Sequence, residues 1–81
     1  MTVPIGRGFE ILLASPPEYE YLVAEISFNG DFVAQLNREK GIDFIEIEFP
    51  DLDVDQTMIC RTVDLDGFLK AVAEAYQKLL G

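Results

Sequence analysis

The dipeptide Asn29-Gly30 constrains the fold of this chain more than any other feature, because it stands between two segments in which apolar side chains alternate. Asn-Gly is a strong signal for a β-hairpin, since both residues tolerate the positive φ angles of a tight turn. Residues 21–28 place alternate apolar side chains on one face, and residues 31–37 repeat the pattern. The sequence therefore predicts an antiparallel hairpin whose turn contains Asn29 and Gly30.

The length of this turn decides which side chains of the hairpin share a face. A two-residue turn pairs Phe28 with Asp31 and leaves the two apolar sets on opposite faces. A three-residue turn pairs Phe28 with Phe32 and Ile26 with Ala34, so that both apolar sets lie on the same face. We therefore expect the three-residue turn.

Residues 15–26 also admit a helical interpretation. Ser15 is followed by two prolines, as at the start of many helices, and four residues follow a helical period: Tyr19, Leu22, Val23 and Ile26. The hairpin signal directly after this segment favours the strand. The apolar run at 9–14 is typical of a first strand, which the sequence SPPE then ends. The run GRG at 6–8 predicts only a flexible N-terminal entry.

A third strand of the meander is predicted over residues 42–49, after a turn at 38–41. If that turn has four residues, Phe32 pairs with Ile47. The apolar face of the hairpin then continues through Ile45, Ile47 and Phe49. The opposite face carries Phe44, Glu46 and Glu48. A shorter strand is expected at 58–63.

Residues 64–81 predict a C-terminal helix. Asp64 is a suitable N-cap, and Asp66 lies where the helix dipole favours negative charge. One apolar stripe is expected to pack on the sheet: Leu65, Phe68, Leu69, Val72, Tyr76, Leu79 and Leu80. The predicted fold is therefore α+β, an antiparallel β-meander of about four to five strands with one C-terminal α-helix packed on one face. No linker or repeat interrupts it, so residues 1–81 are expected to form a single domain.

The balance of charge limits the partners of such a domain. The chain has 15 acidic and 6 basic residues, which gives a net charge of −9. An acidic surface repels phosphate backbones and anionic lipids, so neither nucleic acid nor a membrane is an expected partner. A basic protein would be attracted and would associate quickly. Because the sequence shows neither a signal peptide nor a long apolar run, the expected location is the cytoplasm.

Few side chains offer catalytic or metal-binding chemistry. The chain has no histidine, and its single cysteine, Cys60, is expected to be a small packing residue. Three aspartates match the first, third and fifth positions of an EF-hand loop: Asp51, Asp53 and Asp55. However, Gln56 and Thr62 stand where that loop needs glycine and glutamate. We therefore expect no catalytic residue, no bound metal and no cofactor.

Acidic residues are concentrated in one part of the chain. Between Gly41 and Cys60 there are six acidic residues and no basic residue. One interpretation is a strand face and a loop that are simply solvated. The other is a binding surface for a basic protein, with an aromatic side chain as its apolar anchor. The candidate partner-binding residues are then Phe44, Glu46, Glu48, Asp51, Asp53 and Asp55.

The order of elements resembles that of the small acidic immunity proteins of contact-dependent growth inhibition and related polymorphic-toxin systems. The stretches that carry the resemblance are YLVAEISFNGDFVAQLNREKGIDFIEIEFP and VDLDGFLKAVAEAYQKLL, within residues 21–80. It implies a protein without enzyme activity that binds the C-terminal toxin domain of a bacterial effector, often a basic nuclease, and neutralises it. Immunity proteins share no common functional residues, so the resemblance assigns none here. The alternative is a small acidic intracellular adaptor or structural subunit with no toxin partner.

Overall fold

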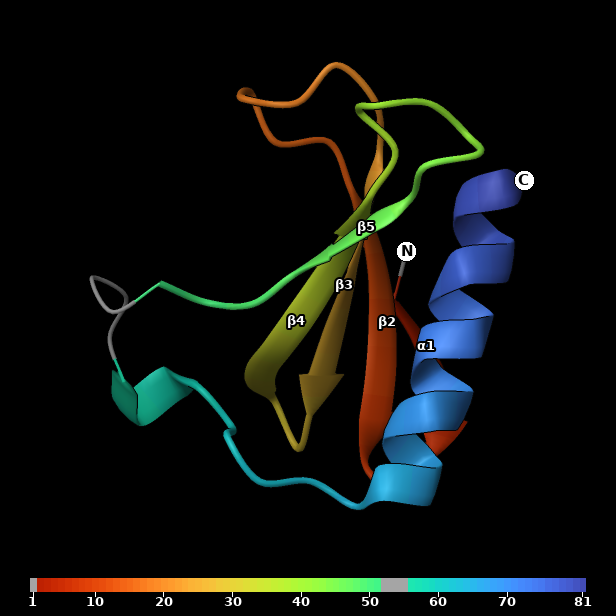
Figure 1. Cartoon of the computed structure of the whole chain (residues 1–81). Coiled ribbons are helices and arrows are strands. Elements are labelled where there is room, and N and C mark those ends of the chain that lie inside the picture. The colour runs from red at the N-terminus through yellow and green to blue at the C-terminus, as the bar shows by residue number, and fades with distance from the viewer. Residues whose placement is uncertain (1, 52–55) are drawn as a thin grey trace.

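The computed structural model describes residues 2–51 and 56–81, which form one antiparallel sheet with a helix on one face (Figure 1). The five strands follow one another in chain order, β1-β2-β3-β4-β5, so the sheet is a meander. This confirms the predicted α+β fold and its C-terminal helix. The elements are β1 (Thr2–Gly6), β2 (Phe9–Ala14), β3 (Val23–Phe28), β4 (Asp31–Asn37), β5 (Glu46–Glu48), a 3₁₀ turn (Gln56–Met58) and α1 (Leu65–Leu80).

The N-terminal segment is a strand of this sheet and not the flexible entry that the sequence predicted. β1 pairs with β2, and Gly6, Arg7 and Gly8 connect them with φ angles of 91°, 55° and 87°. Glycines on both sides of the turn make these left-handed conformations accessible. Pro4, which lacks an amide hydrogen, is tolerated because β1 is an edge strand.

The hairpin between β3 and β4 has a two-residue turn, so the predicted three-residue turn is wrong. Asn29 and Gly30 have φ angles of 50° and 89°, and Phe28 pairs with Asp31 instead of Phe32. These angles are those of the primed turn whose twist matches that of the flanking strands.

A β-bulge nevertheless brings Ala34 and Leu36 onto the face of Ala24 and Ile26, as predicted, but it places Phe32 on the opposite face. Ser27 pairs with Phe32 and Ile26 pairs with Ala34, so Val33 is an extra residue in β4. The extra residue reverses the alternation once, because each single-residue step exchanges the two faces of a strand. Ile26 and Ala34 are both fully buried.

The strand β5 is shorter than predicted and differs in register. Ile47 pairs with Leu36 where Phe32 was expected, a shift of four residues (36 − 32). Two successive turns, closed by Gly41 N donating to Arg38 O and by Phe44 N donating to Gly41 O, take up residues 38–44. Because the shift is an even number, Ile47 still lies on the same face as Leu36, and Glu46 and Glu48 lie on the other.

Residues 58–63 make a single bridge with the sheet, so the strand predicted there is wrong. Ile59 pairs in parallel with Phe32, and Cys60 N donates to Phe32 O at 2.9 Å. The rest of the segment runs in an extended path to the N-cap of α1. The chain there crosses the end of the sheet instead of extending it (Figure 1).

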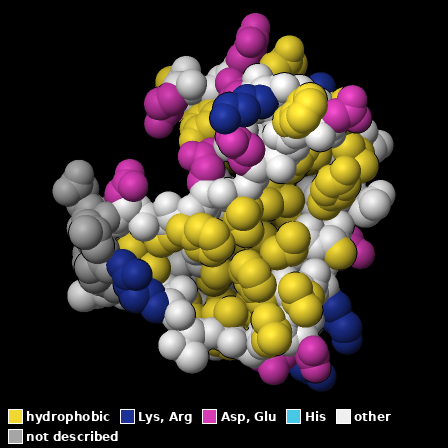
Figure 2. All heavy atoms as spheres, viewed as in Figure 1, with side chains coloured by type: hydrophobic (Ala, Val, Ile, Leu, Met, Phe, Trp, Pro, Cys, Tyr) yellow, Lys and Arg dark blue, Asp and Glu magenta, His cyan; other side chains and the backbone are white. Residues whose placement is uncertain are grey.

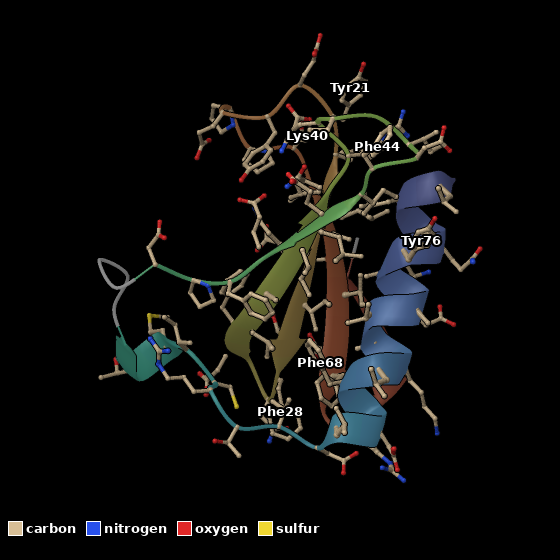
Figure 3. All side chains as sticks on the ribbon, in the orientation of Figure 1. Tyr21, Phe28, Lys40, Phe44, Phe68 and Tyr76 are labelled. Atoms are coloured by element: carbon tan, nitrogen blue, oxygen red, sulfur yellow. The ribbon has the colours of Figure 1, made fainter. Side chains whose placement is uncertain are left out.

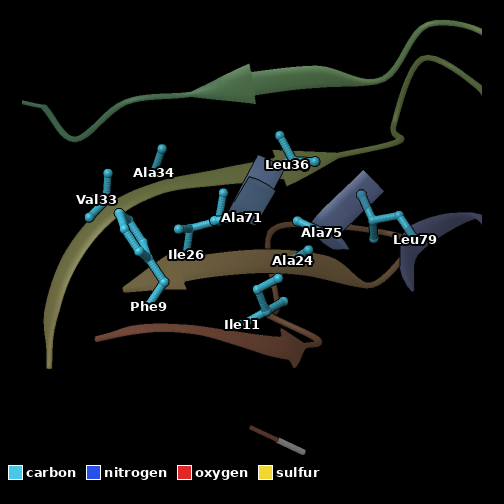
Figure 4. Packing of buried hydrophobic residues seen from close by; sticks show 10 residues of the cluster. All are labelled: Phe9, Ile11, Ala24, Ile26, Val33, Ala34, Leu36, Ala71, Ala75 and Leu79. Atoms are coloured by element: carbon cyan, nitrogen blue, oxygen red, sulfur yellow. The ribbon is translucent and has the colours of Figure 1, made fainter. Parts of the chain in front are cut away.

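The core lies between α1 and the middle of the sheet (Figure 4), where α1 packs chiefly on β2 and β3. Its buried members are Phe9, Ile11, Ala24, Ile26, Val33, Ala34, Leu36, Ala71, Ala75 and Leu79. The helix contributes small side chains to this core and the sheet contributes most of the large ones. This division allows the helix to lie close to the sheet.

The predicted apolar stripe of the helix is right only in part, because Leu79 is buried and Phe68 and Val72 pack against the core, whereas the other four residues are exposed. The residues of α1 that face the sheet are Gly67, Ala71, Ala75 and Leu79, spaced by four. A β-carbon at Gly67 would lie 2.6 Å from Cε2 of Phe9, so only glycine fits there. Leu65 and Leu69, which were expected to be buried, are exposed on the flank of the helix.

Candidate protein-binding groove

An apolar groove runs between α1 and β5 on the helix side of the sheet. It encloses about 420 Å³ and is lined by Leu36, Ile45, Ile47, Leu69, Val72, Ala73, Tyr76 and Gln77. We call it the α1–β5 groove. Figure 2 shows hydrophobic side chains continuous over much of this face of the molecule. All of the lining residues except Gln77 are apolar or aromatic.

The groove exists because one helix is too narrow to cover five strands. Strands lie about 4.8 Å apart, so a five-stranded sheet is roughly 19 Å wide, whereas a helix with its side chains is about 10 Å across. Since α1 packs chiefly on β2 and β3 and less on β4, the β5 edge of the same face has no helix above it. Leu36 of β4 is still buried, whereas Ile47 of β5 is left partly exposed.

The exposure of the groove residues exceeds what a packed two-layer domain needs. Leu69 is 56% exposed, and Tyr76 and Ile47 are each 39% exposed. Single exposed apolar residues are normal on protein surfaces, but several in one continuous patch are typical of an interaction site. These three come from two separate elements and meet at one groove.

A second hollow extends the apolar surface toward the N-terminal end of α1. It encloses about 270 Å³ between α1, residues 49–50 and residues 59–63. Its lining residues are Val33, Phe49, Pro50, Ile59, Cys60, Arg61, Val63 and Phe68. Phe68 and Tyr76 project from α1 near the two ends of this combined surface (Figure 3). The two hollows therefore follow the axis of the helix.

The aromatic candidate Phe44 lies on the loop that leads into β5. It is 68% exposed and is held in a turn by its backbone bond to Gly41. Figure 3 places it at the same end of the molecule as Tyr76 and the C-terminal turns of α1. The side chain is thus free of the core, as an interface anchor must be, at the end of the α1–β5 groove.

The two glutamates of β5 point away from the groove and have different environments. Glu46 is exposed and forms an ion pair with Lys40 at 3.0 Å. Exposed pairs of this kind contribute little to stability because water and salt screen them. Glu46 therefore adds negative charge to the edge of the sheet without being fixed in the core.

The carboxylate of Glu48 belongs to a polar network on the far face of the sheet. Both of its oxygens accept from the Tyr19 hydroxyl at 2.9 Å, and it also accepts from the amides of Asn37 and Gln35. The hydrogen bond to Glu48 raises the pKa of Tyr19 above its ordinary value of 10.0, and burial adds to the effect. This network joins the loop at 15–22 to β4 and β5.

The aspartates of the predicted surface are only partly described. Asp51 is exposed and lies beside Phe49 and Pro50 at the end of the sheet. Asp53 and Asp55 lie outside the described residues. Among the residues that the structure describes, no three potential metal ligands converge on one point. Within the same residues, no helix has the length and hydrophobicity needed to cross a membrane.

Of the four predicted residues that the structure describes, Glu48 and Asp51 border one hollow on the far face of the sheet, and Phe44 and Glu46 do not line it. Phe44 stands near the α1–β5 groove, whereas Glu46 and Glu48 lie on the opposite face of β5. The groove residues on α1 were missed because their helical period predicted burial. The signal that could have found them is the second period on the same helix, Gly67, Ala71 and Ala75, which offers a flatter face to the sheet.

Comparisons of the chain with protein-family models, with curated proteins and with solved structures found no match.

Proposed function

We propose that this chain is an immunity protein, which binds the toxin domain of a bacterial competition system and blocks its activity in the cytoplasm. The observation that carries the proposal is the α1–β5 groove, an uncovered apolar surface on a chain with a net charge of −9. A binding protein needs such a surface, and the described residues offer no converging set of metal ligands beside it.

Apolar and charged residues contribute differently to a protein interface, and an inhibitor needs both contributions. Buried aromatic and aliphatic anchors supply most of the affinity of a protein interface. Opposite charge raises the rate of association and selects among partners. A nuclease toxin must carry a basic surface to hold phosphates, so an acidic inhibitor would reach it quickly. An interface of about 800 Å² per partner would take much of one face of this domain.

The direct test of the proposal is a growth assay. The first step is to search the gene neighbourhood for a large effector, as the proposal requires, and its C-terminal domain is then expressed from an inducible promoter, with and without the chain. The proposal predicts that the domain alone stops growth and that co-expression restores it. A non-cognate immunity protein expressed at the same level is the control.

The proposed function is contradicted if a toxic domain stops growth equally with and without this chain, or if no neighbouring domain is toxic. Rescue by the non-cognate control as well would show that the effect is not specific. The same assay can use Phe44→Ala together with charge reversal at Asp51, Asp53 and Asp55. If those variants rescue as well as the wild type, the acidic segment is not the binding surface.

A further inference from the structure

The β5 side of the sheet has room for one more helix beside α1. The axis of α1 lies over β2 and β3, so a second helix at the usual interaxial distance of about 8–10 Å would have its axis over β4 and β5, which are about 4.8 Å apart. One side of this space is the flank of α1 with Leu69, Val72 and Tyr76, and its floor includes Ile45 and Ile47. The space therefore has the wall and floor that a packed helix requires.

The spacing of the two hollows also fits a helix laid parallel or antiparallel to α1. Phe68 borders one hollow and Tyr76 borders the other, and they lie about 12 Å apart along the helix axis at 1.5 Å per residue. Anchors at positions i and i+7 or i+8 of a partner helix are separated by about the same distance. Helices that bind in grooves use anchors with this spacing.

A partner strand is less well accommodated than a helix. β5 is only three residues long, so it offers few backbone groups to an added strand. A strand added at that edge would also leave the flank of α1 uncovered. The groove residues that most need covering, Leu69 and Tyr76, belong to the helix.

The charge of the chain indicates what the partner helix must carry. Residues 42–51 supply Ile45 and Ile47 to the groove and contain four acidic residues and no basic residue, of which Glu46 and Glu48 lie on the opposite face. Figure 2 shows charged side chains of both signs at the margins of the hydrophobic area, and the chain as a whole has 15 acidic and 6 basic residues. A second copy of this chain also has a net charge of −9, and repulsion between two such chains opposes self-association. Basic side chains beside an apolar face would be attracted.

We propose that the α1–β5 groove binds an amphipathic helix whose apolar face is flanked by Lys or Arg. Under the proposed function, on which this inference rests for its biological partner, the helix belongs to the toxin domain. The helix extends the second layer of the fold over the β5 edge of the sheet, which α1 leaves open. Its basic flank is attracted by the net charge of the whole chain, −9, because Glu46 and Glu48 point away from the groove.

The test uses the purified chain and three synthetic 18-residue peptides. One has leucines at i, i+3, i+4 and i+7 with lysine flanks, the second replaces each lysine by glutamate, and the third is a scramble of the first. Each carries one tryptophan, and because the chain itself has no tryptophan, peptide fluorescence reports binding without background. Amide shifts of the ¹⁵N-labelled chain then locate the bound peptide.

A matched pair of variants tests the position. Leu69→Gln changes an exposed leucine in the groove, and Leu12→Gln changes a partly exposed leucine on the far face of β2. The inference predicts that the lysine peptide binds at least tenfold more tightly than the other two and that high salt weakens it. Leu69→Gln should weaken binding at least fivefold, whereas Leu12→Gln should leave it unchanged. Circular dichroism confirms that both variants fold.

The inference is overturned if the three peptides bind equally, or if Leu69→Gln has no effect on the lysine peptide. It is also overturned if sedimentation shows a dimer that Leu69→Gln dissociates, because the groove would then take a second copy. The growth assay separates the two proposals. If Leu69→Gln rescues growth as strongly as the wild type, the toxin does not bind through a helix in the groove, but the immunity function stands. If the lysine peptide binds the groove but the wild-type chain does not rescue growth, the groove binds a helix and the immunity function falls.

Discussion

At the scale of single residues, Gly67 decides how close α1 lies to the sheet. A β-carbon there would meet the ring of Phe9 at 2.6 Å. The N-cap Asp64 was predictable from the sequence alone, because capping depends on local spacing. The need for glycine at 67 was not, because it depends on a ring that is 58 residues away in the chain (67 − 9).

Replacement of Gly67 by alanine tests that contact. Helix propensity alone would favour the substitution by about 1 kcal/mol. We expect instead a loss of about 1–3 kcal/mol in the free energy of unfolding, because the added methyl group overpacks against Phe9. Urea denaturation followed by circular dichroism measures the change. Ala73→Gly at an exposed position is the control, and a more stable Gly67→Ala protein would contradict the account.

Asp64 links the start of α1 to acid sensitivity. Its carboxylate accepts from Gly67 N at 2.8 Å and from Arg7 Nη1 at 2.7 Å, and these bonds lower its pKa below the ordinary 3.8. A depressed pKa contributes stability that is present above about pH 3.8 and is lost as pH falls through the folded value. We expect the wild type to lose more stability between pH 5 and about pH 3 than Asp64→Asn, which keeps a neutral cap. The free energy of unfolding in urea is measured against pH for both proteins. If it falls equally in the two, this assignment is contradicted.

At the scale of elements, periodicity predicted α1 but not the face that it buries. The helix has two apolar periods, one of large and one of small side chains, and the sheet selected the small one because its own core residues are bulky. The hairpin showed a similar limit. The face shared by Ile26 and Ala34 was predictable, but the bulge at Val33 that moves Phe32 to the other face was not, because several turn and bulge combinations put Ile26 opposite Ala34.

The orientation of α1 can be tested by comparing two neighbouring positions. Leu69→Ala should cost less than about 1 kcal/mol, because the side chain is largely exposed. Ala71→Leu should cost about 1–3 kcal/mol, because Ala71 is fully buried against the sheet. Thermal or urea unfolding measures both. A loss of about 2–5 kcal/mol for Leu69→Ala is the value for a core leucine and would show that the helix is rotated.

The loop at 15–22 depends on a few polar bonds on the far face of the sheet. The Tyr19 hydroxyl bonds Glu48, and Glu39 accepts from the backbone amides of Glu20 and Tyr21. Tyr19→Phe should lower stability by about 1 kcal/mol or less and speed amide exchange in the loop. Tyr21→Phe is the control, since it keeps the ring over which Arg38 stacks at 4.8 Å. If amide exchange in the loop is equally fast in the two variants, Tyr19 does not anchor the loop.

At the scale of the whole molecule, the sequence predicted the meander and its C-terminal helix because alternation, turn signals and capping act locally. It did not predict the α1–β5 groove, because the position of α1 across the sheet follows from packing between residues far apart in the chain. The acidic segment was visible in the sequence. Its relation to an apolar surface required the fold, which places β5 at the edge that α1 leaves open.

The central claim is that the α1–β5 groove is where the partner binds. The measurement that tests it most directly is the dissociation constant of the purified toxin domain for the wild type, Leu69→Gln and Leu12→Gln, by calorimetry at two salt concentrations. The account predicts at least a tenfold weaker complex for Leu69→Gln, an unchanged one for Leu12→Gln, and weaker binding of all three at high salt. Equal affinity of Leu69→Gln and the wild type would contradict it.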